Sequence, residues 1–413
     1  MKHNLLQGDK VIWAIFILLC IISVVEVSSA GSYLVLKEGS FAKPMIQQAT
    51  YVTVALSAAW VLHHIPCRIY KAVMIFGNLI CVPLLIYALL NGQMLNNGAR
   101  WVSFLGLFNF QPSELSKGVL VITAAAAIAS WQKDGRISAT TFNGIVLCAL
   151  VHCGLIVTQN FSTAAIIFAG VNAMFILYRP PRKAMIKTYG ILAGLFLFAA
   201  ISISFLPKDP DAEIYKNPLM HRVTTWRSRV SGDKKIVMTP DPKDFEVTDG
   251  NRQVVNARIA VARSHGTGVL PGRSVQRDYL SAAYSDFIYA IIAEELGLGG
   301  CILVVMLYLW LLFRCGRIAS QTDRVFPAAV AMGFAIMLVG QALINMAVAV
   351  GLGPVTGQPL PLISKGGTAT IITGAYIGII LSASRTIKRK RPDDAAAITD
   401  APDAITAAEF TKD

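Results

Sequence analysis

Long apolar runs recur along the whole chain and are separated by short polar or charged segments. About 20 mostly apolar residues are enough for an α-helix to cross the hydrocarbon core of a bilayer. Runs close to this length lie near residues 11–30, 45–64, 71–90, 112–131, 142–158, 161–178, 185–206, 286–313, 326–350 and 366–384. None alternates strictly between apolar and polar residues, as the strands of a membrane barrel do. The pattern predicts an all-α polytopic membrane protein with about ten transmembrane helices.

The predicted spans belong to one membrane domain, residues 1–391, in which no internal repeat is visible. A segment at about 207–285, rich in proline and charge, separates the seventh span from the eighth and is predicted to be a large extracytoplasmic loop. Loops longer than about 15 residues are usually functional or disordered. Residues 392–413 are rich in Ala, Asp and Thr, and we expect them to form a disordered cytoplasmic tail.

The distribution of positive charge predicts the orientation of the spans. The net charge is +13, although only 15% of the residues are charged, against about 25% in soluble domains. Lys and Arg concentrate on one side of the predicted spans, at Lys2, Lys10, Arg68, Lys71, Lys133, Arg136, Arg179, Arg182, Lys183, Lys187, Arg314, Arg317, Arg324, Arg385, Lys388, Arg389, Lys390 and Arg391. By the positive-inside rule this side is cytoplasmic, and so are both termini. The positive charge thus indicates topology and contact with anionic membrane lipids, and it disfavours a nucleic-acid partner.

Asp286 lies where the long loop enters the eighth span, directly after Ser285. One interpretation is that its carboxylate stabilises the start of a helix, where the helix dipole is positive. The other is that a carboxylate at the membrane surface, partly dehydrated and reachable from outside, serves as a general base. The position alone leaves both interpretations open.

Glu294 and Glu295 follow two helical turns later, about 12 Å along the axis from Asp286. This separation exceeds the roughly 5–9.5 Å between the two carboxylates of a glycosidase. We therefore expect a structural or coupling role for the pair within the bundle. A nearby set of glycines is expected to permit close contact with another helix, and it comprises Gly297, Gly299 and Gly300.

A second polar cluster runs from Arg100 to Lys117, at the start of the fourth span. Pro112 suits the first turn of a helix, and Glu114 lies near its positive end. Glu114 and Lys117 are three residues apart, so their side chains share one helix face and can form an ion pair. Alternatively, Lys117 offers its ammonium group to an anionic lipid headgroup.

A third cluster comprises Gln341 and Asn345 in the ninth span and the Gly- and Pro-rich segment that follows. The two amides are four residues apart and could hydrogen-bond between helices. Ser364 and Lys365 precede the N-terminus of the last span, where a phosphate group is favourable. All three clusters lie on the same predicted face of the membrane. The chain has no Walker, dinucleotide, HExxH or G-x-S-x-G motif and no recognisable set of metal ligands.

These segments, in this order, resemble signatures of the shape, elongation, division and sporulation (SEDS) family, which includes the FtsW, RodA and SpoVE polymerases. Residues Phe110–Lys117 resemble the family's FQPSE-L-x-K segment. Residues Ser285–Gly297 resemble TDFIF-AEELG, and Gly357–Gly367 resemble TG-PLP-SYGG. Residues Gly272–Leu280 are closer to the form of the division branch, that of FtsW, than to the elongation branch.

The resemblance implies a peptidoglycan glycosyltransferase that polymerises lipid II at the outer face of the bacterial cytoplasmic (inner) membrane, in cell division at the septum. The donor would be a glycan on undecaprenyl pyrophosphate, and the acceptor the 4-hydroxyl of an incoming lipid II. Asp286 would take the acceptor proton while attack inverts the anomeric carbon. The expected substrate-binding residues are Arg100, Glu114, Lys117, Arg273, Arg277, Asn345, Ser364 and Lys365.

The family also implies partners. These are a class B penicillin-binding protein, other divisome proteins and the lipids of the membrane. A divalent cation could help to neutralise the leaving pyrophosphate, although the sequence shows no ligand set for it.

The chain departs from the family pattern at the entrance to the sixth span. The usual QPD-GTA segment is here Gln159–Ala164 and has no Asp. Lys365 stands where Tyr is common, and Thr368 and Ala369 replace a usual Ser pair. These changes indicate a divergent lineage, and the effect of the missing Asp does not follow from the sequence.

Two other functions stay open. A lipid II flippase or another transporter would use the intramembrane ionisable groups Glu26, Lys117, Glu294 and Glu295 as a path. The lack of an inverted repeat and of a pair of broken helices argues against it. In a non-catalytic divisome scaffold, Asp286 would be dispensable.

Overall fold

A computed structural model gives the fold. It describes residues 6–31, 42–91, 93–95, 98–104, 108–133, 135–205, 251–280, 282–353 and 355–387, together with Val247. The predicted tail at 392–413 lies outside the described residues, as does most of the predicted outer loop between 206 and 250.

Within the described residues, helices occupy all ten ranges that the apolar runs predict. They are α1 (Lys10–Ser29), α3 (Ala42–His64), α4 (Val73–Asn91), α5 (Pro112–Trp131), α6 (Ala139–Val157), α7 (Phe161–Tyr178), α8 (Arg182–Ser204), α11 (Ile288–Gln321), α12 (Val325–Ala349) and α13 (Thr368–Ser384). Eight of the described helices are long and apolar enough to cross a membrane, and α8 and α13 are not among them. The polytopic α-helical class is therefore confirmed, while the number of ten spans stays a prediction.

Short elements between the long helices were not predicted. In the described residues they are η1 (Cys67–Ala72), β1 (Gln93–Leu95), β2 (Gly98–Phe104), β3 (Phe108–Phe110), β4 (Gln132–Lys133), β5 (Arg136–Ile137), α10 (Arg252–Arg263) and η4 (Gln276–Asp278). Strands β1, β2 and β3 form an antiparallel sheet in that order between α4 and α5. Strands of two to seven residues are too short for an alternating pattern to stand out from neighbouring apolar runs.

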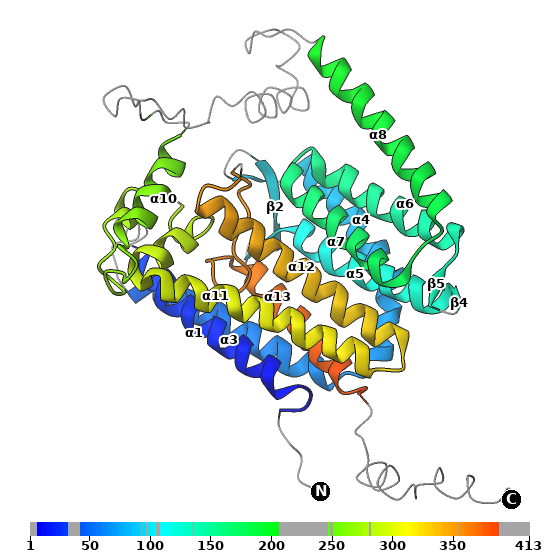
Figure 1. The fold of residues 1–413 in the computed structure, drawn as a ribbon, viewed down its shortest axis with the longest axis horizontal. Helices are drawn as coiled ribbons and strands as arrows, with labels where there is room; N and C mark the ends of the chain where they lie inside the picture. The colour runs from blue at the N-terminus through cyan, green and yellow to red at the C-terminus, as the bar shows by residue number, and fades with distance from the viewer. Residues whose placement is uncertain are drawn as a thin grey trace, which may run out of the picture.

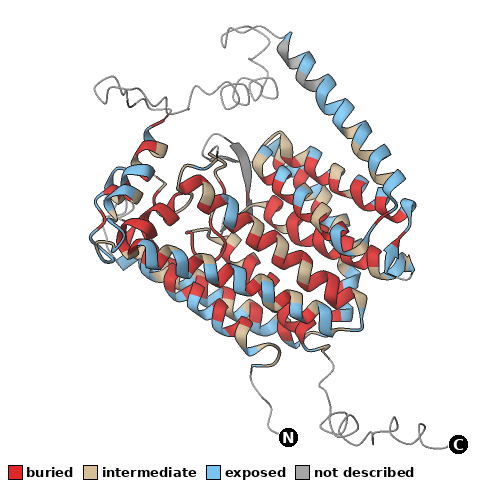
Figure 2. Ribbon diagram, viewed as in Figure 1, coloured by how far each residue is buried: buried red, intermediate tan, exposed pale blue. Residues whose placement is uncertain are grey.

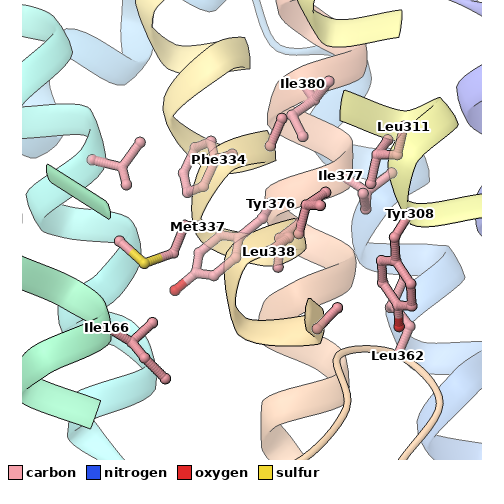
Figure 3. Packing of buried hydrophobic residues seen from close by; sticks show 14 of the residues in the cluster. Ile166, Tyr308, Leu311, Phe334, Met337, Leu338, Leu362, Tyr376, Ile377 and Ile380 are labelled. Carbon is pink, nitrogen blue, oxygen red and sulfur yellow. The ribbon is translucent and has the colours of Figure 1, made fainter. Parts of the chain in front are cut away.

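Helix α12 lies at the centre of the bundle, packed against α5, α7, α11 and α13 (Figure 1). Helix α5 is buried along most of its length, because every residue from Pro112 to Ile128 except Leu115 is buried (Figure 2). Between α12 and α13 the rings of Phe334 and Tyr376 stack, with 4.6 Å between their centroids (Figure 3). These helices form the rigid body on which the polar clusters are placed.

Helix α8 is the least packed of the long helices. Only its start contacts the bundle, where the Thr188 hydroxyl donates to Asn143 of α6 at 2.9 Å and Tyr189 packs on Phe142. Further along, α8 projects away from the other helices with exposed apolar side chains such as Phe196 and Phe198 (Figure 2). In a membrane, lipid or a partner helix would cover this surface.

Helices α3 and α13 approach closely through small residues. Gly374 and Gly378 of α13 face Ala55 and Ala59 of α3, and these glycines and alanines are each four residues apart. This small-xxx-small arrangement lets two helix backbones come into contact. A Cβ atom at Gly374 would lie 2.5 Å from the carbonyl oxygen of Ala55.

We expect Gly374→Ala to lower the thermal unfolding temperature of the detergent-solubilised protein, because the added methyl group forces α3 and α13 apart. Overpacking of this kind costs about 1–3 kcal/mol. Gly144→Ala in α6 is the matched control, since a Cβ there meets no atom within 4 Å. Equal unfolding temperatures for the two variants would contradict the close contact between α3 and α13.

Candidate active site

Asp286 lies in the turn before α11, whose described helical residues begin at Ile288. Three consecutive carbonyl oxygens of this turn accept hydrogen bonds from α12 and from the loop after it. The donors are the Lys365 N–H to Tyr284 (2.9 Å), the Ser364 hydroxyl to Ser285 (2.6 Å) and the Asn345 side-chain amide to Asp286 (2.8 Å). The third polar cluster of the chain therefore meets the backbone of the turn that carries Asp286, although the two are far apart in sequence.

The Asp286 side chain is half-buried and faces Gly357. A Cβ atom built at Gly357 would lie 3.7 Å from Asp286 Oδ2, and Gly357 has a φ of +63°. This backbone conformation favours glycine, which leaves room beside the carboxylate. Asp286 precedes the N-cap residue Phe287, so its carboxylate lies before the first turn of α11.

Gln341 and Asn345 hold the loop that carries Gly357. The Asn345 amide donates to the carbonyl of Gln358 at 2.7 Å, and the Gln341 amide donates to that of Pro359 at 2.9 Å. The prediction that Gln341 and Asn345 share one face of their helix is confirmed. Their partners are carbonyls of an irregular loop, which needs such donors because it forms no backbone ladder there.

Lys117 and Glu114 form the ion pair that their spacing predicts, with 2.7 Å between Nζ and Oε2. The Lys117 ammonium also donates to Gln341 Oε1 at 2.8 Å and is only 3% exposed. Two of its three N–H donors are thus used inside the protein. Lys117 links α5 to α12, and its position indicates a positioning residue rather than an open cation at the surface.

The other predicted substrate-binding cations lie in different places. Arg100 is on β2, and its side chain lies outside the described part of the structure. Arg273 is exposed, and Lys365 Nζ lies 5.7 Å from the ring centroid of Tyr284. Arg277 donates to the carbonyl of Ser29 at the end of α1, at 3.1 Å. Lys365 is therefore next to the turn of Asp286, whereas Arg277 joins the outer loop to α1.

Glu294 and Glu295 bind the backbone of the outer-loop segment 264–278. The N–H donors are Gly272 (3.2 Å) and Ser274 (3.4 Å) to Glu295, and Val275 (3.2 Å) and Gln276 (3.3 Å) to Glu294. The hydroxyls of Ser29 and Ser274 donate to Glu295 and Glu294 respectively. Arg263 Nε lies 3.4 Å from Glu294 Oε1. Both glutamates are buried, and together they fasten this segment to α11.

The eighth span is broken, which corrects the predicted continuous helix at 286–313. Gly297 has φ +66° and ψ −161°, values outside the helical region. The segment 264–278 fills the break, because Val269 and Leu270 donate to the carbonyls of Glu294 and Glu295 at 3.0 and 2.8 Å. Leu298 N–H donates in return to Gly266 O at 2.9 Å. We call the contacts of segment 264–278 with Glu294, Glu295 and Leu298, through both backbone and side chains, the loop latch.

The expectation that Gly297, Gly299 and Gly300 permit close contact with another helix is wrong. A Cβ at Gly297 would meet the loop, 2.5 Å from Gly266 O. At Gly300 it would meet Leu296 of the same helix, and at Gly299 it would meet nothing within 4 Å. Gly297 therefore allows the helix to break, and it does not lie at a contact between two helices.

Sequence reasoning missed several residues that support the site. Gln358 donates to Thr163 of α7 at 2.9 Å, which ties the loop beside Asp286 to a further helix. Asn160 caps α7 by accepting the Thr163 N–H at 3.3 Å. Asn and Asp are equally good N-caps. The missing Asp of the Gln159–Ala164 segment therefore leaves no gap in the capping of α7.

Within the described residues, no three His, Cys, Asp or Glu side chains gather as a metal-binding group. The described side chains thus identify no ligands for the divalent cation considered from the sequence. The charged group that the structure places beside the turn of Asp286 is the ammonium of Lys365.

The family model of the cell cycle proteins FtsW, RodA and SpoVE matches residues 9–389. This chain belongs to that family. Among its relatives, a probable peptidoglycan glycosyltransferase FtsW from Pseudomonas fluorescens is 30% identical over 373 residues, 87% of this chain and 84% of the relative. The peptidoglycan glycosyltransferase MrdB of Escherichia coli is 28% identical over 325 residues, 78% of this chain and 80% of the relative.

Solved structures of this family share the fold. A chain from a peptidoglycan synthase complex, described as coordinating polymerization and crosslinking, has a TM-score of 0.67 at 23% identity and covers 92% of this chain and 99% of its own. The rod shape determining protein RodA of Thermus thermophilus has a TM-score of 0.62 at 22% identity, covering 92% of this chain and 98% of its own. An aspartate-to-alanine mutant of the same RodA gives a TM-score of 0.63.

We expect Gly297→Ala to destabilise the protein, because the backbone conformation at Gly297 is accessible essentially only to glycine. Such strain costs about 1–3 kcal/mol, and the clash with Gly266 adds to it. Gly299→Ala, two residues away in the same helix, is the control because a Cβ there meets open space. The measurement is thermal unfolding in detergent. An unchanged unfolding temperature for Gly297→Ala would show that α11 need not break there.

We expect Lys117→Met to destabilise the protein strongly, because it leaves the buried carboxylate of Glu114 without its cation. Removing one partner of a buried pair costs about 3–5 kcal/mol. The double variant Glu114→Gln with Lys117→Met removes both charges and should recover much of the lost unfolding temperature. If the single variant is as stable as the wild type, Lys117 is not a positioning residue.

Proposed function

We propose that this protein is a peptidoglycan glycosyltransferase that polymerises lipid II into glycan strands at the outer face of the cytoplasmic membrane. The observation that carries the proposal is Asp286, which lies in a turn whose three carbonyls at 284–286 accept hydrogen bonds and whose carboxylate faces Gly357. A half-buried carboxylate on a fixed turn suits a general base, since it is positioned before the substrate arrives. The membership of a family whose relatives are named as glycosyltransferases supports the same reaction.

In this mechanism Asp286 takes the proton of the acceptor hydroxyl. The oxygen of that hydroxyl attacks the anomeric carbon of the donor glycan at the same time. The bond to undecaprenyl pyrophosphate breaks, and the configuration of that carbon inverts. Lys365 and Arg100 are the cations that we assign to the leaving pyrophosphate. Lys365 lies beside the turn of Asp286, and Arg100 lies on β2, which leads through β3 to the start of α5.

The orientation rests on which groups share an end of the bundle. Asp9 and Ser384 are in contact, with 2.9 Å between Asp9 N and Ser384 Oγ, so the start of α1 and the end of α13 lie together (Figure 1). Helix α1 has 20 residues, so its far end, Ser29 at the loop latch, lies about 30 Å away. With both termini cytoplasmic by the positive-inside rule, the latch and the segment before α11 face outward.

The proposed partners follow from this placement. A class B penicillin-binding protein would crosslink the strands as they leave the outer face, and the exposed surface of α8 and the outer loop are the contact surfaces we assign to it. Residues Gly272–Leu280 resemble the division branch, so we place the enzyme with other divisome proteins at the septum.

The transporter alternative is weakened by how its candidate path residues are used. Lys117 is paired with Glu114 and Gln341, and Glu294 and Glu295 bind the loop backbone. Groups committed to such contacts must break them before they can pass a charged substrate. Glu26 is buried on α1, yet it is one residue rather than a path.

We expect Asp286→Asn to lower the rate of glycan-strand formation from labelled lipid II by about 10²–10⁴-fold, because an amide cannot accept the acceptor proton. Asn keeps the size of the side chain and the backbone carbonyl that Asn345 binds, so the unfolding temperature should not change. Asp278→Asn, at an exposed carboxylate in η4, is the control and should polymerise at the wild-type rate.

The assay uses purified protein with its penicillin-binding partner in detergent, where no transbilayer step exists. A wild-type protein that forms no strands under these conditions would favour the transporter or the scaffold. An Asp286→Asn protein as active as the wild type would remove Asp286 from the role of base.

A further inference from the structure

A cavity of about 650 Å³ opens at the end of the bundle that carries both termini, opposite the loop latch. Its walls come from η1, the end of α5, the start of α12 and the residues after α13. Four cations line it, namely Arg68, Lys71, Arg324 and Arg385. Among the residues that the structure describes, no carboxylate lines the cavity.

Two of the lining cations are held in place by groups that leave their charge intact. Arg385 Nη1 donates to the carbonyls of His63 and His64, at 2.7 and 3.1 Å. Lys71 Nζ lies 5.5 Å from the ring centroid of Phe326, which also lines the cavity. Carbonyls and an aromatic face orient a cation without neutralising it.

The salt bridges formed among the described residues use other cations. They are those of Lys117, Arg263, Arg277 and Arg314. Asp323 precedes Arg324 in the chain but does not line the cavity. Four like charges around one cavity repel each other, and a bound anion would relieve that repulsion.

The start of α12 adds to the positive potential. Arg324 is its N-cap, and Val325, Phe326 and Pro327 of the first turn line the cavity, so Val325 and Phe326 supply the N–H groups there because Pro327 has none. The first N–H groups of a helix have no partner within the helix and carry the positive end of its dipole. No acidic residue lies in this first turn. Helix start and side chains thus favour the same kind of ligand, a phosphate group.

We propose that this cavity binds a phosphate group, that of an anionic phospholipid in the cytoplasmic leaflet. The leaflet follows from the orientation proposed above, whereas the anion site itself does not depend on the enzymatic activity. A lipid fits the location, because η1 also exposes Ile69, 54% accessible, between two of the cations, which gives an acyl chain an apolar surface. Basic pockets between transmembrane helices on this side of a membrane commonly bind such headgroups.

The test compares two double variants that lose the same charge. Arg68→Gln with Arg324→Gln removes two lining cations. Arg136→Gln with Arg317→Gln removes two exposed cations that do not line the cavity but lie on the same predicted side. Delipidated full-length protein is titrated in detergent with phosphatidylglycerol, phosphatidylcholine or inorganic phosphate. Native mass spectrometry counts bound lipid, and thermal unfolding reports stabilisation by each probe.

We expect the wild type and the Arg136/Arg317 variant to bind phosphatidylglycerol in preference to phosphatidylcholine. The Arg68/Arg324 variant should bind phosphatidylglycerol on the order of tenfold more weakly, since each cation near the headgroup strengthens binding. Stabilisation by inorganic phosphate alone, lost in the same variant, would assign the site to a soluble phosphate and overturn the lipid. Equal binding by both variants would overturn the anion site altogether.

Discussion

The carboxylates of Glu294 and Glu295 and the backbone they bind are the contact on which the end of the bundle beside segment 264–278 depends. A buried carboxylate is costly unless hydrogen bonds replace its water. Here the N–H groups of Gly272, Ser274, Val275 and Gln276 and two serine hydroxyls supply such bonds. The break at Gly297 leaves helix carbonyls unsatisfied at the same place, and the loop satisfies them as well. The loop and the helix therefore satisfy each other's polar groups. A change on one side leaves polar groups of the other side without hydrogen bonds.

The loop latch also fixes the short stretch that carries Asp286. This stretch, 282–296, is anchored at its far end by the latch and at its near end by Asn345, Ser364 and the Lys365 N–H. These hydrogen bonds to backbone carbonyls hold the stretch in place. The turn of Asp286 is thus held from both sides, which is the support that the base proposed above would require.

The features that the sequence predicted correctly are those set by local periodicity. The apolar runs locate the long helices, and spacings of three and four residues place Glu114 with Lys117 and Gln341 with Asn345. The break at Gly297 was missed because its cause is a loop about 30 residues earlier, and a glycine inside an apolar run resembles any other helical glycine. The contact of Arg277 with Ser29 was missed for the same reason, since it spans 248 residues. The short strands around Arg100 are too brief to leave a pattern.

Charged groups are arranged in opposite ways at the two ends of the bundle. The difference matches the ligand proposed for each end. At the loop latch, buried carboxylates accept hydrogen bonds from the loop, and deeper in the bundle Lys117 is paired with Glu114. In the mechanism proposed above, the anionic leaving group is met by Lys365 beside the turn of Asp286, while the buried charges of Lys117 and Glu114 pair with each other. At the other end, four cations and no described carboxylate line a cavity. A positive-inside bias alone needs only that these residues lie on one side of the membrane. Their convergence on one cavity and one helix start is a further arrangement, and it is the part of the +13 net charge that topology does not explain.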